Sequence, residues 1–248
     1  SMEVFRIYGQ QDSGSSELSR ILVQFPVSEI STDRTNGVLP PSGSVSFYLR
    51  LFNAKHPFTL PRNYDMIVST ISRAWNEGTG MDMEDYSSSM DNYSDSGSSN
   101  WTAASSASSG VTAWSTAGGD YEAEPRFTAS FVDGTEDIEL NVSDAVERWI
   151  VGSRTNYGFG VRMENETAFS SSYTKKFFAR ESEFFFSRPV IEARWDSSTR
   201  DDRGNFFFSS SLATSEDNLN TLYLYNNVRG RLRNIPDVGT GSIYVSVY

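Results

Sequence analysis

Short stretches in which apolar and polar residues alternate recur along this chain. A period of two places successive side chains on opposite faces of an extended backbone, which is typical of half-buried β-strands. Glycine, proline, serine and asparagine separate the stretches, as expected for turns between antiparallel strands. The predicted strands cover residues 4–8, 19–27, 45–52, 64–71, 126–131, 137–142, 156–163, 173–179 and 189–195. The pattern therefore predicts an all-β fold with very little helix.

The most informative stretch is residues 137–163, where a strand, a short helical turn, a glycine stop and a second strand follow one another. The side chain of Ser143 or Asp144 can cap the helical turn by accepting a hydrogen bond from a free backbone N–H. Gly152 ends the turn, and Gly158 marks the entry to the second strand. This order describes a fold and assigns no chemistry.

The spacing of strands and turns indicates one large domain and a smaller C-terminal part. Residues 2–195 are predicted to form a β-sandwich with long loops, among them residues 31–44. Residues 79–120 form a long excursion from this domain, and residues 196–204 form a charged linker. Residues 205–248 contain about three predicted strands, too few for a core of their own. They are interpreted as a β appendage or as the start of a further β domain.

Composition and charge exclude several kinds of function. The net charge is −11 and the predicted pI is near 4.6, which argues against nucleic-acid binding, since that needs a basic surface. The chain has no cysteine and one histidine, His56, so thiolate sites and sites of several histidines are impossible. No apolar run approaches the ~18 residues of a membrane span, so membrane insertion is not expected.

Two clusters of carboxylates are candidate sites for a structural calcium ion. Calcium takes several oxygen ligands from carboxylates, carbonyls and water. Neither cluster matches an EF-hand loop, and a solvated acidic loop without metal is the alternative interpretation. The candidate ligands are Asp82, Glu84 and Asp85 in the first cluster and Asp133, Glu136 and Asp137 in the second.

Aromatic residues of the long excursion are candidates for stacking on sugar rings. An apolar ring face can cover the CH groups of a sugar while polar neighbours bond its hydroxyls. The alternative is that the tryptophans are internal pins that order the excursion, and this interpretation is favoured for both of them. The candidate residues are Trp101, Trp114, Tyr86 and Tyr93.

The remaining tryptophans are predicted to be core residues. Trp75, Trp149 and Trp195 lie in predicted regular elements. Large aromatic side chains bury much apolar surface and usually supply cores. Trp75 is also expected to help pin the excursion.

Motifs in an ordered series give the chain a resemblance to a known family. The first motifs are the run 18–25, the corner 75–78, and Trp101 and Trp114 with Gly118-Gly119-Asp120. They are followed by the turn 142–149 with Gly152, Asn156 and Gly158, and then by Arg180-Glu181 and the run 188–192. Together they resemble DNRLRE-type domains over residues 18–195. The resemblance implies a jelly-roll β-sandwich similar to carbohydrate-binding modules.

A second set of motifs resembles large structural proteins of marine tailed phages. They are Lys55-His56, residues 60–65, Trp195-Asp196, residues 200–203, residues 222–226 and Val228-Arg229-Gly230. This resemblance implies a virion component such as part of a tail, fibre or surface appendage. Its partners would be other virion proteins, copies of itself or a glycan of the host surface.

Three functions follow from these observations. The first is a non-enzymatic virion protein for structure or adhesion that requires no cofactor. The alternative is a carbohydrate-binding module that recognises a host or extracellular polysaccharide. The second alternative is a polysaccharide-degrading enzyme that uses a carboxylate pair. With 32 acidic residues in the chain, no local motif singles out one pair, so no catalytic residue is assigned.

Overall fold

The computed structural model shows two compact units, Ser1–Asp196 and Ser197–Tyr248. The residues that the structure describes are 1–8, 16–58, 60–77, 98–106, 110–166, 172–196, 204–228 and 231–233.

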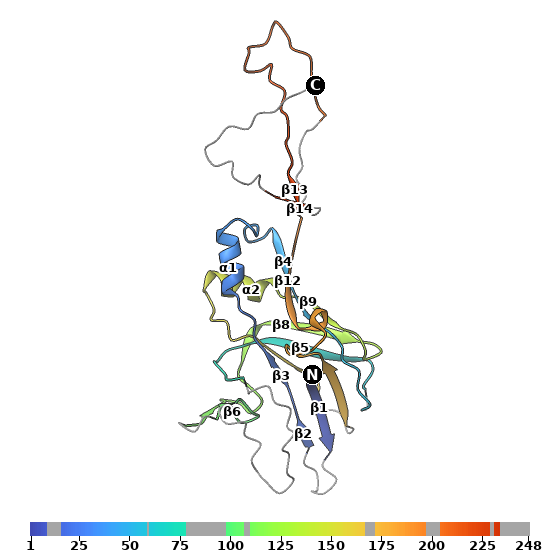
Figure 1. Cartoon of the computed structure of the whole chain (residues 1–248). Helices are drawn as coiled ribbons and strands as arrows, with labels where there is room; N and C mark the ends of the chain where they lie inside the picture. Colours follow the sequence, from blue (N-terminus) through green and yellow to red (C-terminus); the bar gives the residue numbers. More distant parts are fainter. Residues whose placement is uncertain are drawn as a thin grey trace. The chain divides into compact units, whose positions relative to one another are not determined.

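Antiparallel strands dominate the first unit (Figure 1), so the all-β prediction is confirmed. Its strands are β1 (Met2–Tyr8), β2 (Ser16–Leu18), β3 (Ile21–Val23), β4 (Val45–Leu51), β5 (Tyr64–Ile71), β6 (Ala103–Ser105), β7 (Thr112–Ala113), β8 (Tyr121–Phe131), β9 (Ile138–Asn141), β10 (Phe159–Met163), β11 (Tyr173–Phe177) and β12 (Val190–Trp195). Its helical segments, among the described residues, are α1 (Ser28–Thr35), α2 (Ser143–Val151) and the 3-10 turn η1 (Phe185–Ser187). The jelly-roll arrangement of the sandwich stays a prediction.

Three sheets carry the core of the first unit. Their strand orders are β11-β1-β2, β3-β10-β5-β8 and β12-β4-β9, and the short strands β6 and β7 pair separately. In β4 every second residue is buried, as the period-two pattern predicts. Central strand β5 is buried on both faces over most of its length. Fully buried residues of the core include Phe47, Leu49, Met66, Val68 and Phe159.

The stretch around α2 follows its sequence pattern closely, with one correction. Gly152 ends the helix with φ of 76°, and β10 begins directly after Gly158. The predicted side-chain cap is wrong, because α2 has no side-chain cap hydrogen bond. The Ser143 hydroxyl oxygen instead accepts a bond of 2.8 Å from the backbone N–H of Phe47. Ser143 therefore ties the helix to β4.

Helix α1 corrects the prediction of a loop that begins at residue 31. Its sequence has no amphipathic pattern and none of its residues is buried, so the usual signal for a helix is missing. The helix is fixed from outside, because Arg34 donates two hydrogen bonds of 2.6 and 2.7 Å to the carboxylate of Glu147 on α2. Because Arg34 and Glu147 lie far apart in the sequence, local composition cannot predict their contact.

Two further predictions are wrong. Trp195 is 39% exposed and is not a core residue. In the second unit, residues 206–208 and 221–226 are not strands, and the described strands there are β13 (Asn227–Val228) and β14 (Arg231–Leu232). The predicted strand 242–248 lies outside the described residues.

Candidate functional site

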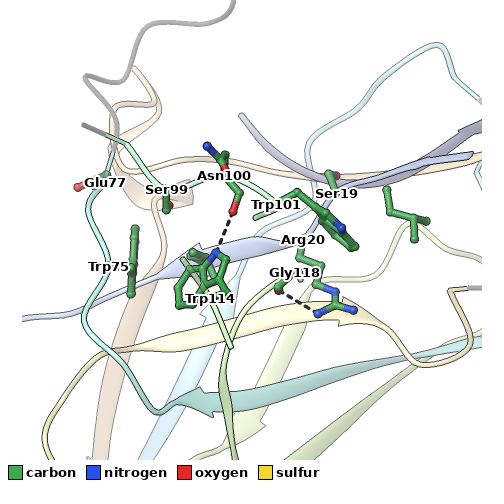
Figure 2. A pocket seen from close by; sticks show the side chains of 11 residues that line it. Ser19, Arg20, Trp75, Glu77, Ser99, Asn100, Trp101, Trp114 and Gly118 are labelled. Carbon is green, nitrogen blue, oxygen red and sulfur yellow. Dashed lines mark hydrogen bonds between the residues drawn. The ribbon is translucent and has the colours of Figure 1, made fainter. Parts of the chain in front are cut away.

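A groove of about 350 Å³ lies beside the β6–β7 pair, and three tryptophans line it (Figure 2). We call it the tryptophan groove. This volume falls in the lower part of the range of small-molecule sites, about 300–1,000 Å³. Its lining residues are Leu18, Ser19, Arg20, Leu22, Trp75, Glu77, Ser99, Asn100, Trp101, Trp114 and Gly118.

Two of the tryptophans form a fixed wall of the groove. Trp114 is only 7% exposed and belongs to a small core, against which Trp75 packs. The indole N–H of Trp114 donates to the carbonyl of Asn100, and that of Trp75 donates to the carbonyl of Tyr157, each at 2.8 Å. The burial of Trp114 agrees with its interpretation as an internal pin. Both rings are held in place before any ligand arrives.

Trp101 differs from this wall, because 36% of it is exposed. The guanidinium of Arg20 lies 4.9 Å from the centre of its ring, close enough for a cation–π contact. Among the described residues, none accepts a hydrogen bond from the indole N–H of Trp101. Unlike Trp114, Trp101 therefore presents part of its ring to the groove.

Arg20 is held by contacts on several sides. It forms a bidentate ion pair with Glu166 and donates a bond of 2.9 Å to the carbonyl of Gly118. The ring of Tyr121 lies 5.7 Å away. Burial by itself would lower the pKa of Arg20, but the bonds to Glu166 and the nearby Tyr121 raise it overall. Arg20 is therefore a fixed positive charge at the side of the groove.

Glycine is required where Arg20 crosses the excursion. Gly118 has φ of +88°, a left-handed conformation that other residues adopt at a cost. A Cβ atom at Gly118 would lie 2.7 Å from Nη1 of Arg20 and 3.0 Å from Cη2 of Trp101. The absence of a side chain at this position makes room for the Arg20–Trp101 contact.

The groove also offers polar groups with free hydrogen-bonding capacity. The side-chain oxygen of Asn100 accepts bonds from the N–H groups of Thr102 and Ala103, which fixes the amide plane. Within the described part of the chain, no residue accepts a bond from its amide nitrogen. Trp101 and Asn100 thus present N–H donors beside an exposed aromatic face.

A second cavity of about 740 Å³, which is open and polar, shares Arg20 with the groove. We call it the arginine basin. Part of its lining comes from the ends or faces of strands in the sheet β3-β10-β5-β8, and the rest comes from the segment between β7 and β8. Its lining residues are Arg20, Ser72, Arg73, Ser115, Thr116, Gly119, Asp120, Tyr121 and Arg162.

The second predicted calcium cluster lies around a buried lysine. The ammonium of Lys175 donates to the carbonyls of Gly134 and Glu136 at 2.8 Å each, and to Oδ1 of Asn53 at 2.7 Å. These carbonyls are the type of oxygen that a calcium ion would use. Here the loop oxygens surround a cation that belongs to the protein.

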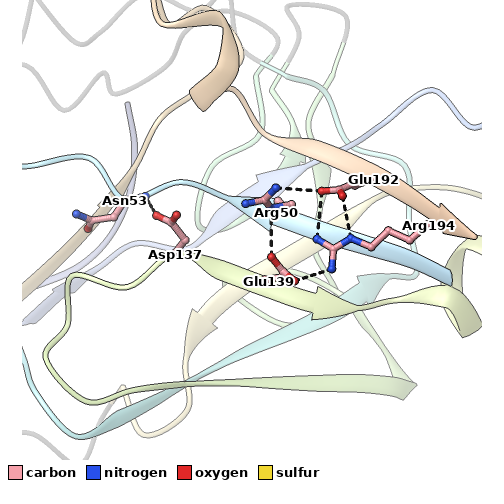
Figure 3. Close-up of polar contacts among 6 residues, drawn as sticks. All are labelled: Arg50, Asn53, Asp137, Glu139, Glu192 and Arg194. Carbon is pink, nitrogen blue, oxygen red and sulfur yellow. Dashed lines mark hydrogen bonds and ion pairs between the residues drawn. The ribbon is translucent and has the colours of Figure 1, made fainter. Parts of the chain in front are cut away.

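Two carboxylates of this cluster, those of Glu136 and Asp137, bond to separate partners. Oε1 of Glu136 accepts bonds from the backbone N–H groups of Val132 and Asp133, and these bonds lower its pKa to about 2. Oδ1 of Asp137 accepts a bond of 2.7 Å from the N–H of Asn53 (Figure 3). In the described ranges, no three potential ligands gather closely enough to hold a metal ion. Calcium at Asp133, Glu136 and Asp137 stays a prediction.

Other predicted site residues lie outside the described residues. They are Asp82, Glu84 and Asp85 of the first calcium cluster, and Tyr86 and Tyr93 of the sugar-stacking set.

The strands β4, β9 and β12 carry a closed network of four charges (Figure 3). Arg194 bonds Glu139 at 2.7 Å and Glu192 at 2.8 Å, and Arg50 bonds Glu192 at 3.0 Å and Glu139 at 3.4 Å. Bonds from Arg194 and Arg50 lower the pKa of Glu192 to about 2. The two positive and two negative charges satisfy one another, so this surface offers no net charge to a ligand.

The sequence identified part of the site. It indicated Trp101 and Trp114, but Arg20, Asn100 and Arg162 were not singled out as site residues. The motifs that carry the family resemblance do contain Arg20, Gly118 and the tryptophans Trp75, Trp101 and Trp114, and this was the available signal. Nothing local to Arg162 indicates that it lines a cavity.

Comparison with known proteins gives no match: no family model, no curated protein and no solved structure is significantly similar to this chain. None of the described helices has the length and apolar character that crossing a bilayer requires.

Proposed function

We propose that this protein is a non-enzymatic adhesion protein that binds a saccharide in the tryptophan groove. The observation that carries this proposal is Trp101, an exposed ring held against Arg20 in the groove that the amide of Asn100 also lines. A sugar ring has an apolar face of CH groups and hydroxyls at its edge. An aromatic face with donors at its side matches both.

The carboxylates near the groove support binding rather than hydrolysis. Glu77 pairs with Arg180 at 3.0 Å, and Glu166 pairs with Arg20. A glycosidase needs one carboxylic acid that is protonated and able to donate. Both carboxylates near the groove are instead already engaged by an arginine.

Trp101→Ala is expected to raise the Kd for a bound saccharide at least about tenfold, because it removes the aromatic face of the site. A panel of immobilised glycans identifies a ligand, and isothermal titration calorimetry then gives the Kd of each variant. Trp195→Ala is the matched control, since Trp195 has nearly the same exposure, 39% against 36%, and lies outside the groove.

Equal Kd values for the Trp101 and Trp195 variants would contradict the proposed site. Failure of the intact protein to bind any glycan of a broad panel would reject saccharide binding altogether.

A second candidate function is that of a virion structural protein that associates with other virion proteins or with copies of itself. The observation that favours it is a pair of exposed segments with the same sequence, Phe-Phe-Phe-Ser, at residues 184–187 and 206–209. All six phenylalanines are at least half exposed. Soluble monomers rarely expose contiguous apolar surface unless it serves an interaction.

The mass of the intact protein by light scattering is expected to exceed that of a monomer and to rise with concentration. Replacing residues 206–208 by serine is expected to lower this mass, because it removes the exposed rings. Measuring in calcium and in chelator tests in parallel whether an ion is needed. A monomer under all conditions, or absence of the protein from purified virions by mass spectrometry, would contradict the assembly function.

A further inference from the structure

The arginine basin carries a positive charge that its own carboxylates do not cancel. Arg20 pairs with Glu166, and Arg73 pairs with Asp120 at 3.4 Å. Arg162 is the third guanidinium of the basin, and among the described residues no carboxylate pairs with it. One positive charge is therefore left over in a chain whose net charge is −11.

Arg162 has hydrogen-bond donors to spare. It lies on β10, is half-buried, and its Nη1 donates long bonds of 3.3 and 3.4 Å to the carbonyls of Met163 and Glu164. A guanidinium has five N–H groups in a planar fork. The fork matches the two oxygens of a carboxylate or sulfate group, and such charge-assisted bonds are stronger than neutral ones.

Asp120, the acidic residue that lines the basin, already accepts hydrogen bonds from other groups. The two carboxylate oxygens of Asp120 accept bonds of 2.9 and 3.0 Å from the backbone N–H groups of Ser115 and Thr116. Burial alone would raise the pKa of Asp120, but these bonds and the charge of Arg73 lower it overall. Asp120 therefore shapes the loop that forms one side of the basin and leaves Arg162 to an outside anion.

The ring of Tyr121, at the start of β8, can lie against β10 because β10 has a glycine there. A Cβ atom at Gly160 of β10 would come within 2.2 Å of the Tyr121 ring. The Tyr121 hydroxyl donates a bond of 2.7 Å to the carbonyl of Gly118, the same carbonyl that Arg20 bonds. The groove and the basin thus share one rigid boundary, formed by Arg20, Tyr121 and Gly118.

From this arrangement we infer that the site takes an acidic saccharide, with a sugar ring on Trp101 and its carboxylate or sulfate group in the basin at Arg162. The inference rests on the proposed function of the groove and names the class of ligand. Uronic acids and sulfated sugars share the required chemistry, a planar or tetrahedral anion attached to a ring. A neutral sugar fills the groove alone and leaves the charge of Arg162 unused.

The test compares three short oligosaccharides by isothermal titration calorimetry: a neutral glucan, a uronic acid oligomer and a sulfated galactan. At least one acidic ligand is expected to bind about tenfold more tightly than the neutral one, since one charge-assisted contact is worth at least that factor. The acidic ligand that binds more tightly identifies the anion as carboxylate or sulfate.

Arg162→Gln is expected to weaken binding of the acidic ligand about tenfold and to leave binding of the neutral ligand unchanged. Arg162→Lys keeps the charge without the fork and is expected to give an intermediate affinity. Arg154→Gln is the matched control, because it removes the same charge from an arginine that pairs with Glu122 at 3.2 Å and lines neither cavity. Thermal unfolding of each variant verifies that it is folded.

The outcomes separate the inference from the function on which it rests. Equal affinity for neutral and acidic ligands, or an equal effect of the Arg162 and Arg154 variants, overturns the acidic class and leaves saccharide binding standing. Absence of binding for all three ligands and for every glycan of the panel overturns both. Acidic preference that depends on Arg162 supports both.

Discussion

Replacing Lys175 by methionine is expected to lower the free energy of unfolding by about 4 kcal/mol near neutral pH. Lys175 is fully buried on β11, and its ammonium donates one bond each to Asn53, Gly134 and Glu136. Methionine has a similar length but no N–H group, so it leaves three oxygens, one of them buried and two partly buried, without this donor. It also removes a positive charge that interacts with the carboxylate of Glu136.

Lys176→Met is the matched control for this prediction. Lys176 is the next residue on β11, so its side chain points to the opposite face of the strand. It is more exposed and pairs with Glu3 at 3.1 Å. Loss of such a surface pair costs about 1 kcal/mol or less. Urea unfolding followed by tryptophan fluorescence measures both variants, and equal losses would show that the ammonium of Lys175 is not a structural cation.

A comparison of wild type with Lys175→Met also reports the charge of Lys175 at alkaline pH. Burial lowers the pKa of Lys175 to about 8, although Glu136 and Asp137 oppose this. Between pH 8 and the ordinary value of 10.5, the unfolded state binds more protons at this residue than the folded state. The contribution of Lys175 to stability therefore rises with pH in that window. The stability difference between wild type and Lys175→Met is expected to grow from about pH 8 to about pH 10.

Burial also raises the pKa of Tyr64 and Tyr173, the latter to about 12. Folded tyrosines that keep their protons contribute stability below pH 10, and this contribution is lost as the pH rises through the folded pKa. Because both tyrosines are present in both proteins, their effect cancels in the difference. A pH-independent difference would contradict the assignment of the shift to Lys175.

The sequence could not reveal that a buried lysine, Lys175, bonds to the loop of residues 133–137. Residues 173–177 read Tyr-Thr-Lys-Lys-Phe, and either lysine could face solvent in an alternating strand. Which one is buried depends on the pairing of β11 with β1 and on Asn53 and Gly134, which approach from other parts of the chain. The acidic residues 133–137 were visible in the sequence, but the cation that neutralises their loop was not.

The strands were predicted well because their signal is local. In β4 the alternation of apolar and polar residues coincides with the alternation of buried and half-buried positions. Helix α1 was missed because its stability depends on the pair Arg34–Glu147, not on an apolar face. Arg20 was not singled out as a site residue for the same reason, since its partner Glu166 is 146 residues away. Local pattern determines the elements, whereas the site depends on distant pairs.

Gly158→Ala is expected to lower the free energy of unfolding by about 3 kcal/mol or more. Gly158 has φ of +83°, and a Cβ atom there would lie 2.2 Å from the carbonyl oxygen of Val23 and 2.9 Å from Cα of Gln24. Both are backbone atoms, so the new methyl group can be accommodated only if β3 and β10 separate. These strands pair through Phe159 and Val23, directly beside the clash.

Gly152→Ala measures the cost of the left-handed backbone conformation without the steric clash that Gly158→Ala adds. Gly152 has a nearly equal φ of +76°, but nothing lies within 4 Å of the position of its Cβ atom. Its substitution therefore costs only the left-handed conformation, about 1 kcal/mol. The sequence marked both glycines as turn positions of the same stretch and could not rank them, because the approach of Val23 is a tertiary contact. Urea unfolding of the two variants measures the difference directly. Equal losses would mean that the junction of β3 and β10 yields to the methyl group.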